Sequence, residues 1–183
     1  EMNLSLAQAS ARVKLDESTS ARALATYVRS IRSGNSPFDR YAAGQRDALT
    51  ALALAGLRVF RGSGNCTACH VGPNFTDERM HNTGVSFRDG RFVDEGHASL
   101  RGGDADRGAF KTPTLREVGR TAPYMHDGSL ASLEAVVHFY ERGGRTNPGL
   151  DAEMRPRALT ASDRIALVAF LKALTGDVRE GWR

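Results

Sequence analysis

Both cysteines of this 183-residue chain lie in one short motif, Cys66-Thr67-Ala68-Cys69-His70. Two cysteines separated by two residues and followed at once by a histidine form the attachment pattern of a c-type haem. Thiols at this spacing reach the two vinyl-derived carbons of one porphyrin, and the adjacent imidazole then falls beneath the iron. The motif therefore predicts one covalent haem held by Cys66 and Cys69, with His70 as the proximal iron ligand.

Other kinds of site use a Cys-x-x-Cys pair, namely a redox-active dithiol and one half of a zinc site. A four-ligand zinc site would need a second tight pair of Cys or His, and none of the five histidines is spaced in that way. With both cysteines in one motif, none is left for a disulfide framework. The haem interpretation is therefore favoured.

Helical periodicity predicts an all-α fold. Five segments are expected to be helical: residues 4–15, 20–31, 45–60, 132–142 and 160–174. Cytochrome c folds cross an N-terminal and a C-terminal helix beside the haem, and Gly56 and Phe60 against Phe170 and Leu171 would make that crossing. We expect a cytochrome c-like domain over residues 45–183, preceded by a helical extension over residues 1–44.

The stretch from Cys66 to Thr112 is rich in Gly, Asp, Asn and Arg and has little periodicity of either kind. It is expected to be loop, with one short hairpin around Asp89-Gly90. A loop of this length in a compact domain needs something to wrap around, and a haem would serve. The sequence therefore predicts long loops around the covalent haem.

Composition restricts the partners. Formal net charge is +4, but the arginines and the carboxylates are interspersed along the chain, so nucleic-acid binding is not favoured. The same charge would equally suit docking to an acidic redox partner. No run of about 18 apolar residues is present, so we expect no membrane span. The sequence begins at Glu1 without a leader, as expected of a processed product or an excerpt. Because bacterial c-type haem is attached outside the cytoplasm, a periplasmic location is expected.

Several side chains could provide the sixth iron ligand. A segment with helical periodicity places Leu133, Val136, Val137 and Tyr140 on one face, where an aromatic residue is usually part of the core. His138 falls on the other face. Met or His is the usual distal ligand of an electron-transfer haem. The candidates are Met80, Met125, His81, His97, His126, His138 and Tyr140.

Over most of its length the sequence resembles the C-terminal haem domain of the bacterial di-haem cytochrome c peroxidase and MauG family. The resemblance rests on four segments together. They are Ser36-Pro37-Phe38-Asp39-Arg40, the haem motif with Gly72-Pro73-Asn74-Phe75-Thr76-Asp77 after it, Phe110-Lys111-Thr112-Pro113-Thr114-Leu115-Arg116, and Thr121-Ala122-Pro123-Tyr124-Met125-His126-Asp127-Gly128-Ser129.

This resemblance implies an axial ligand. Members of the family place the distal ligand of this haem at a fixed interval after the His-Asp-Gly turn, which here gives Tyr140. Cytochrome c peroxidases carry Met at that position and MauG-like members carry Tyr. A phenolate favours oxidised iron, so the resemblance implies a His70/Tyr140 haem of low potential.

Further site residues follow from the resemblance. The carbonyls of Thr121 and Pro123 would bind Ca²⁺, together with water and an Asn from the N-terminal domain. Lys111 and Arg116 would pair with haem propionates, although solvated surface charge explains them nearly as well. His126 would brace its turn through a hydrogen bond.

The chain departs from the family pattern in two places. Only one haem motif is present, whereas family enzymes hold a second, peroxidatic haem in a preceding domain. Glu1-Met2 resembles the end of that domain, where a Glu is the distal acid-base group, so Glu1 would be a catalytic remnant. Gly64 stands where MauG has a Trp that relays electrons to its protein substrate, and the single tryptophan, Trp182, lies elsewhere. MauG's substrate therefore does not transfer.

Two functions follow from these observations. In the first, the chain is the electron-transfer part of a MauG-like peroxidase, whose H₂O₂ chemistry occurs at a haem outside this chain, with a redox protein as its partner. In the second, the chain is a stand-alone monohaem electron carrier without peroxidase activity.

Overall fold

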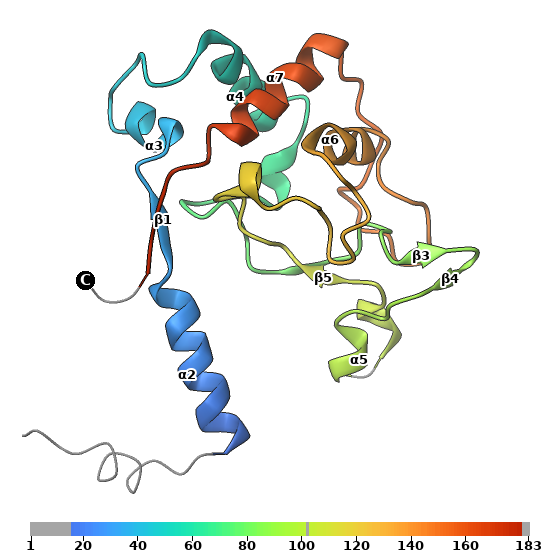
Figure 1. Cartoon of the computed structure of the whole chain (residues 1–183). Helices are drawn as coiled ribbons and strands as arrows, with labels where there is room; N and C mark the ends of the chain where they lie inside the picture. Colours follow the sequence, from blue (N-terminus) through green and yellow to red (C-terminus); the bar gives the residue numbers. More distant parts are fainter. Residues whose placement is uncertain (1–15, 102, 181–183) are drawn as a thin grey trace, which may run out of the picture. The chain divides into compact units, whose positions relative to one another are not determined.

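The structure is a computed structural model that describes residues 16–101 and 103–180 (Figure 1). Its contacts divide the chain into two compact units, and each is described by itself. Unit 1 joins the N-terminal segment up to Gly34 with the C-terminal segment from Asp177, and unit 2 runs from Asn35 to Gly176. In the described part of the chain, no helix is both long and apolar enough to cross a membrane.

The described residues of unit 1, 16–34 and 177–180, contain one helix and one pair of strands. Helix α2 (Glu17–Ser30) begins after Asp16, whose side chain accepts from the Thr19 amide in a capping box. The helix predicted over residues 20–31 is therefore confirmed and starts slightly earlier. Strand β1 (Arg32–Gly34) pairs antiparallel with β6 (Asp177–Arg179). The predicted helix over residues 4–15 lies outside the described residues.

Unit 2 contains four helices of six residues or more, and side-chain caps set where they begin. Thr50, Ser132 and Thr160 each accept a hydrogen bond from the amide three residues later. The helix expected from residue 45 therefore starts after Thr50, whereas those expected at 132–142 and 160–174 are confirmed within a residue or two. The four are α3 (Pro37–Ala42), α4 (Ala51–Arg61), α6 (Leu133–Glu141) and α7 (Ala161–Lys172).

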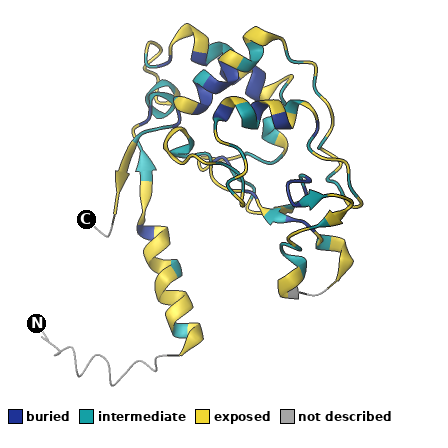
Figure 2. Cartoon of the chain, turned by 45° about the vertical axis from the view of Figure 1, so that its right-hand side comes forward, coloured by how far each residue is buried: buried dark blue, intermediate teal, exposed yellow. Residues whose placement is uncertain are grey.

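The core of unit 2 is the crossing of α4 and α7. A Cβ placed on Gly56 would overlap the carbonyl of Ala166, so only glycine allows this approach. Phe60, Phe170 and Leu174 are almost completely buried beside it. Figure 2 shows the buried positions gathered on these helices, while α2 is mainly exposed. The predicted crossing is confirmed.

Helix α3 extends the core in a place where the sequence indicated only a stop. Ser36 caps it and Pro37 occupies its first turn, a position at which proline stabilises a helix. The Phe38 ring packs edge to face against Phe75 and Phe170, with centroids 5.1 and 5.8 Å apart. Unit 2 therefore begins at Asn35, whereas the sequence placed the division after residue 44.

The long loop is organised by short antiparallel strands. Strand β2 (Met80–His81) pairs with β5 (Phe110–Lys111), and β3 (Phe87–Arg88) pairs with β4 (Arg91–Phe92). The second pair is the hairpin predicted around Asp89-Gly90, both of which have positive φ. Backbone groups of a folded loop need hydrogen-bond partners, and the strands provide them. The regular elements of the described residues are thus mostly helices with a few small strands, and the all-α class is not confirmed.

Three short helical turns and one short helix complete the described elements. They are η1 (Cys66–Ala68), α5 (Ala98–Arg101), η2 (Asp104–Asp106) and η3 (Val118–Arg120).

Candidate haem site

The haem motif forms a tight turn directly after α4. Cys66, Thr67 and Ala68 make the turn η1, and the His70 amide donates to the Cys66 carbonyl over 2.9 Å. Both cysteines are free thiols. A Cβ on Gly64 would lie 2.9 Å from the Val59 carbonyl and 3.3 Å from Cys66 Sγ, so this position has no room for a larger side chain without movement of the turn.

The imidazole of His70 is oriented by the backbone. Its Nδ1 lies 2.8 Å from the Phe75 carbonyl oxygen, which can only accept, so Nδ1 carries the proton. Nε2 therefore keeps its lone pair. Burial lowers the pKa of His70 below its ordinary value, which favours the neutral ring. A neutral imidazole with its second nitrogen held by a carbonyl is the usual arrangement of a metal-binding histidine.

The two thiols are not activated as nucleophiles. Burial raises the pKa of Cys66 to about 12. Burial, followed by the carboxylates of Asp77 and Asp151, raises the pKa of Cys69 to about 11. A redox-active dithiol needs a lowered thiol pKa, so these values argue against that alternative and leave the motif suited to covalent attachment.

Tyr140 lies near the C-terminal end of α6. Burial of its hydroxyl end raises the pKa of Tyr140 to about 12, and the charges of Cys69 and Cys66 add to this shift. Leu133 and Val137 on the same stripe are buried at 3% and 4% exposure, yet Tyr140 keeps 37% of its surface exposed. The expectation that residues on this apolar helix face belong to the core therefore holds for Leu133 and Val137 but not for Tyr140. Its assignment as the distal ligand stays a prediction.

The histidines proposed as alternatives have other partners. His81 lies between Asp77 and Asp151, with N···O distances of 2.9 and 2.5 Å, and His97 contacts Asp106 over 2.9 Å. His138 is exposed beside Glu141. Both nitrogens of His81 are engaged by carboxylates, which makes it a poor distal ligand.

The remaining candidates are His126 and two methionines. The His126 ring stacks on Phe110 with centroids 3.6 Å apart, and its Nε2 is 3.8 Å from Asp94. The hydrogen bond that we expected within its own turn is not among the interactions of the His126 ring in the described part of the chain. Met80 is 39% exposed, and Met125 has a left-handed backbone with φ of 70°.

A cluster that the sequence did not reveal lies beside Cys69. The Cys69 Sγ is 3.8 Å from His81 Nδ1. Cys69, Asp77 and His81 each offer one potential metal-ligand atom, and these three atoms lie within 4.8 Å of one another. Burial by itself would lower the pKa of His81, but the hydrogen bonds to Asp151 and Asp77 raise it above its ordinary value. His81 and Asp151 lie 70 positions apart in the sequence, so periodicity gave no signal for their contact.

This cluster predicts a pH-dependent stability. A raised pKa means that His81 stabilises the fold fully below its ordinary value of 6.5 and that this contribution is lost as the pH rises through the folded pKa. Asp77, whose pKa falls from 3.8 to about 2, stabilises above 3.8 and loses this contribution toward pH 2. We expect the melting temperature of the protein to be highest between these limits, and His81→Gln to flatten its decline above pH 6.5. Exposed His138→Gln is the control; an equally steep decline in His81→Gln would contradict the assignment.

The two residues predicted to pair with propionates have carboxylate partners in the chain. Arg116 Nη1 lies 2.8 Å from Asp39, its Nε donates to the Pro73 carbonyl, and its guanidinium lies over the Phe75 ring. Lys111 Nζ is 2.7 Å from Glu78. The propionate contacts of both residues stay predictions, and Arg116 has an evident structural role that joins α3 to the haem loop.

Removal of the Arg116 guanidinium should destabilise the fold. The Arg116 side chain is only 12% exposed. Burial by itself would raise the pKa of Asp39, but hydrogen bonds from Ser36 and Arg116 hold it below its ordinary value, and the variant would remove the Arg116 contribution. Breaking such a pair costs several kcal/mol when fully buried, so we expect Arg116→Gln to lower the free energy of unfolding by about 2 kcal/mol. Arg120→Gln removes the ion pair of Glu117 with an arginine whose side chain is 60% exposed, and should cost less than about 1 kcal/mol. Equal losses in denaturant titrations would contradict this role.

The carbonyls predicted to bind Ca²⁺ lie on an exposed turn. Pro123 follows the cis Ala122-Pro123 bond and Thr121 precedes it by one residue, and no hydrogen bond in the described part of the chain ends on either carbonyl oxygen. Two free carbonyls are compatible with an oxygen-ligated cation but do not make a complete site. Glu1 and Trp182 lie outside the described residues.

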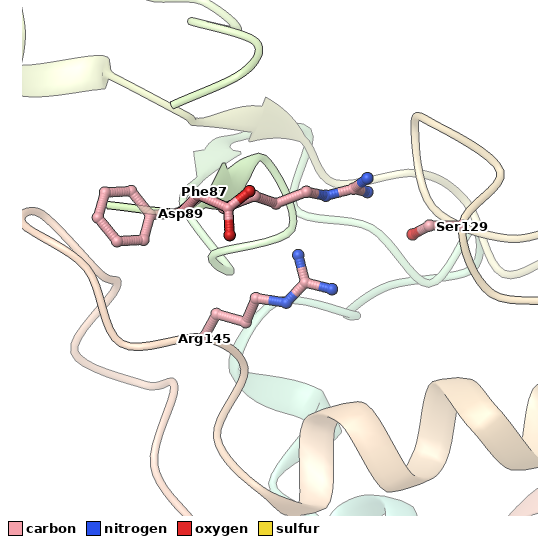
Figure 3. A pocket seen from close by; sticks show the side chains of 5 residues that line it. Phe87, Asp89, Ser129 and Arg145 are labelled. Carbon is pink, nitrogen blue, oxygen red and sulfur yellow. The ribbon is translucent and has the colours of Figure 1, made fainter. Parts of the chain in front are cut away.

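A polar pocket of about 560 Å³, which no sequence feature predicted, lies at the β3–β4 hairpin (Figure 3). It is lined by Phe87, Arg88, Asp89, Ser129 and Arg145.

No protein-family model matches the chain. Curated proteins and solved structures do. The chain is 43% identical over 155 residues to the methylamine utilization protein MauG of Methylorubrum extorquens, covering 85% of this chain and 43% of that protein. It is 38% identical over 177 residues to the cytochrome-c peroxidase IdrP2 of Denitromonas iodatirespirans, covering 82% of this chain and 47% of that protein.

A solved structure agrees with these relatives. The crystal structure of a MauG-like protein associated with microbial copper homeostasis superposes with a TM-score of 0.76 at 30% identity, covering 93% of this chain and 61% of that one. The chain spans about half the length of the curated relatives it matches. The motifs, the helical crossing and these matches lead to one conclusion: the chain belongs to the family of MauG proteins and di-haem cytochrome c peroxidases, which are oxidoreductases.

Proposed function

We propose that this chain is the electron-transfer haem part of a MauG-like di-haem peroxidase and that it passes electrons or oxidising equivalents to or from a peroxidatic haem held outside these residues. One observation carries the proposal. In the haem motif, the Phe75 carbonyl holds His70 Nδ1 and leaves Nε2 with its lone pair, and both cysteines of the same motif are free thiols. These groups suit the attachment of one covalent haem, and Tyr140 would complete its iron ligation.

Each residue has a distinct part in this proposal. Cys66 and Cys69 would hold the porphyrin, His70 would bind the iron from the proximal side, and Tyr140 from the distal side. The bound haem would supply a one-electron redox centre. The chain itself orients His70 through Phe75 and keeps the imidazole neutral through burial. An iron with two protein ligands has no position for peroxide, so this part of the protein would transfer electrons and not turn over substrate.

The wider setting of the proposal comes from the relatives. They are named as MauG and as cytochrome-c peroxidases, and the chain spans less than half of each. We therefore propose a second haem domain or chain as its partner, a Ca²⁺ near the carbonyls of Thr121 and Pro123, and a periplasmic location, where c-type haem is attached.

A second candidate is a monohaem electron carrier, which is favoured by the single haem motif in this sequence. The two candidates differ in haem content and in peroxide turnover. A carrier would hold one haem and show negligible turnover, whereas the assembled peroxidase would hold two haems and consume peroxide.

The test is a haem count on the native assembly, with pyridine haemochrome absorbance set against intact mass before any denaturation. We expect two haems per assembly and peroxide-dependent oxidation of a reduced cytochrome, with the chain alone at background. One haem with no partner would overturn the peroxidase proposal and favour the carrier.

A further inference from the structure

The pocket at the β3–β4 hairpin contains two arginines that the proposed haem ligation does not use. Arg88 ends strand β3, and Arg145 follows the two glycines after α6, the helix that carries Tyr140. The Arg145 guanidinium and the Asp89 carboxylate point into the pocket, and Ser129 faces it from the neighbouring loop (Figure 3). The pocket therefore gathers side chains from three segments that are distant in sequence.

The hydrogen-bonding capacity of the two arginines is only partly used. Arg88 pairs with Asp127 through Nη2, but its Nε is buried and has no acceptor in the described part of the chain. Arg145 donates from Nη1 to the Val85 carbonyl over 3.1 Å, and it forms no ion pair with a carboxylate of the described residues. A buried donor without an acceptor costs free energy. A ligand that accepts a hydrogen bond from Arg88 Nε would remove that cost.

The chemistry of this missing acceptor is restricted by the donors. Guanidinium groups present a planar fork that matches a carboxylate, and the Ser129 hydroxyl adds a neutral donor. Arg116 and Lys111, the cations that the sequence suggested for propionates, are engaged by Asp39 and Glu78. Asp89 lies at the pocket with the opposite charge and would weaken the binding of any anion.

We propose that the pocket lined by Arg88, Ser129 and Arg145 binds a carboxylate. Two sources share this chemistry, a propionate of the haem on this chain and a free small carboxylate from solution. The first source rests on the proposed function, because it needs the covalent haem. The second does not.

The test compares three variants of the haem-loaded protein. Arg145→Gln removes the charge and keeps a donor for Val85. Arg142→Gln is the matched control, since Arg142 is exposed, three positions away and not part of the pocket. Asp89→Asn removes the opposing charge. Each variant is first checked for attached haem, and then the midpoint potential is followed against pH and acetate is titrated by calorimetry.

If the source is a propionate, Arg145→Gln should move the redox-linked titration to higher pH by about one unit, because an adjacent cation lowers the pKa of a carboxyl group. Asp89→Asn should move it to lower pH, and acetate should not bind. If the source is free, acetate should bind the wild type, about tenfold more weakly after Arg145→Gln and more tightly after Asp89→Asn.

The inference is overturned if Arg145→Gln equals Arg142→Gln in both measurements. A wild-type protein without attached haem would instead refute the proposed function. In that protein the pocket would have no propionate, so acetate should bind, and its failure to bind would overturn this inference separately.

Discussion

Replacement of Cys66 and Cys69 by alanine should give a protein without covalent haem and with a melting temperature lower by about 10 °C or more, since a domain of this size loses about 2–4 °C per kcal/mol. The described core shows why the effect should be large. Among the described residues of the loop from Cys66 to Thr112, Phe75 is the only buried member of the apolar cluster of unit 2, and Cys66 packs against it partly buried. The long loop thus has few apolar contacts of its own, and we expect it to depend on the haem. Intact mass and thermal unfolding measure both effects.

The matched control for this double variant is Ala68→Ser, which changes an exposed position of the same turn and keeps both thiols. It should retain the haem and the melting temperature of the wild type. If the double alanine variant unfolds with the same cooperative transition as the wild type, the loop does not depend on the haem and the haem-centred structure is contradicted.

Replacement of Tyr140 by phenylalanine should leave the haem attached, change the ferric absorption spectrum and raise the midpoint potential by about 0.1 V or more, within the ~0.8 V that axial ligands span. Thioether attachment does not depend on the distal ligand, whereas loss of an anionic oxygen donor destabilises ferric iron. Spectroscopy and a redox titration of the purified protein measure the two effects.

The control for Tyr140→Phe is Tyr41→Phe, which removes the hydroxyl of another tyrosine that packs against the core. It should leave spectrum and potential unchanged. An unchanged spectrum in Tyr140→Phe would refute Tyr140 as the ligand and return Met125 or His81 to consideration, although both nitrogens of His81 contact carboxylates.

Local sequence signals were sufficient for most of the helices. Periodicity and caps such as Thr160 located α7, and the missing side chain of Gly56 correctly indicated where α4 and α7 cross. Helix α3 was missed because Ser36-Pro37 is both a common stop and a good helix start, and the choice depends on contacts of Phe38 with distant rings.

The candidate site was only partly predictable for a similar reason. The haem motif is local, so Cys66, Cys69 and His70 could be named from five consecutive residues. The Phe75 carbonyl that orients His70 is a backbone group, which has no signature in the sequence. Arg116 and Asp39 form an ion pair although they lie 77 positions apart, and the pocket brings Arg88 and Arg145 together from separate segments. Neither arrangement could be predicted before the structure was known.

The central claim is tested most directly by tandem mass spectrometry of the proteolytic peptide that contains Cys66 and Cys69, taken from protein matured in a host that attaches c-type haem. The account predicts one haem bound through both sulfurs of this single peptide, with a Soret band in the intact protein. A peptide of unmodified mass, or one with Cys66 and Cys69 joined in a disulfide, would contradict it.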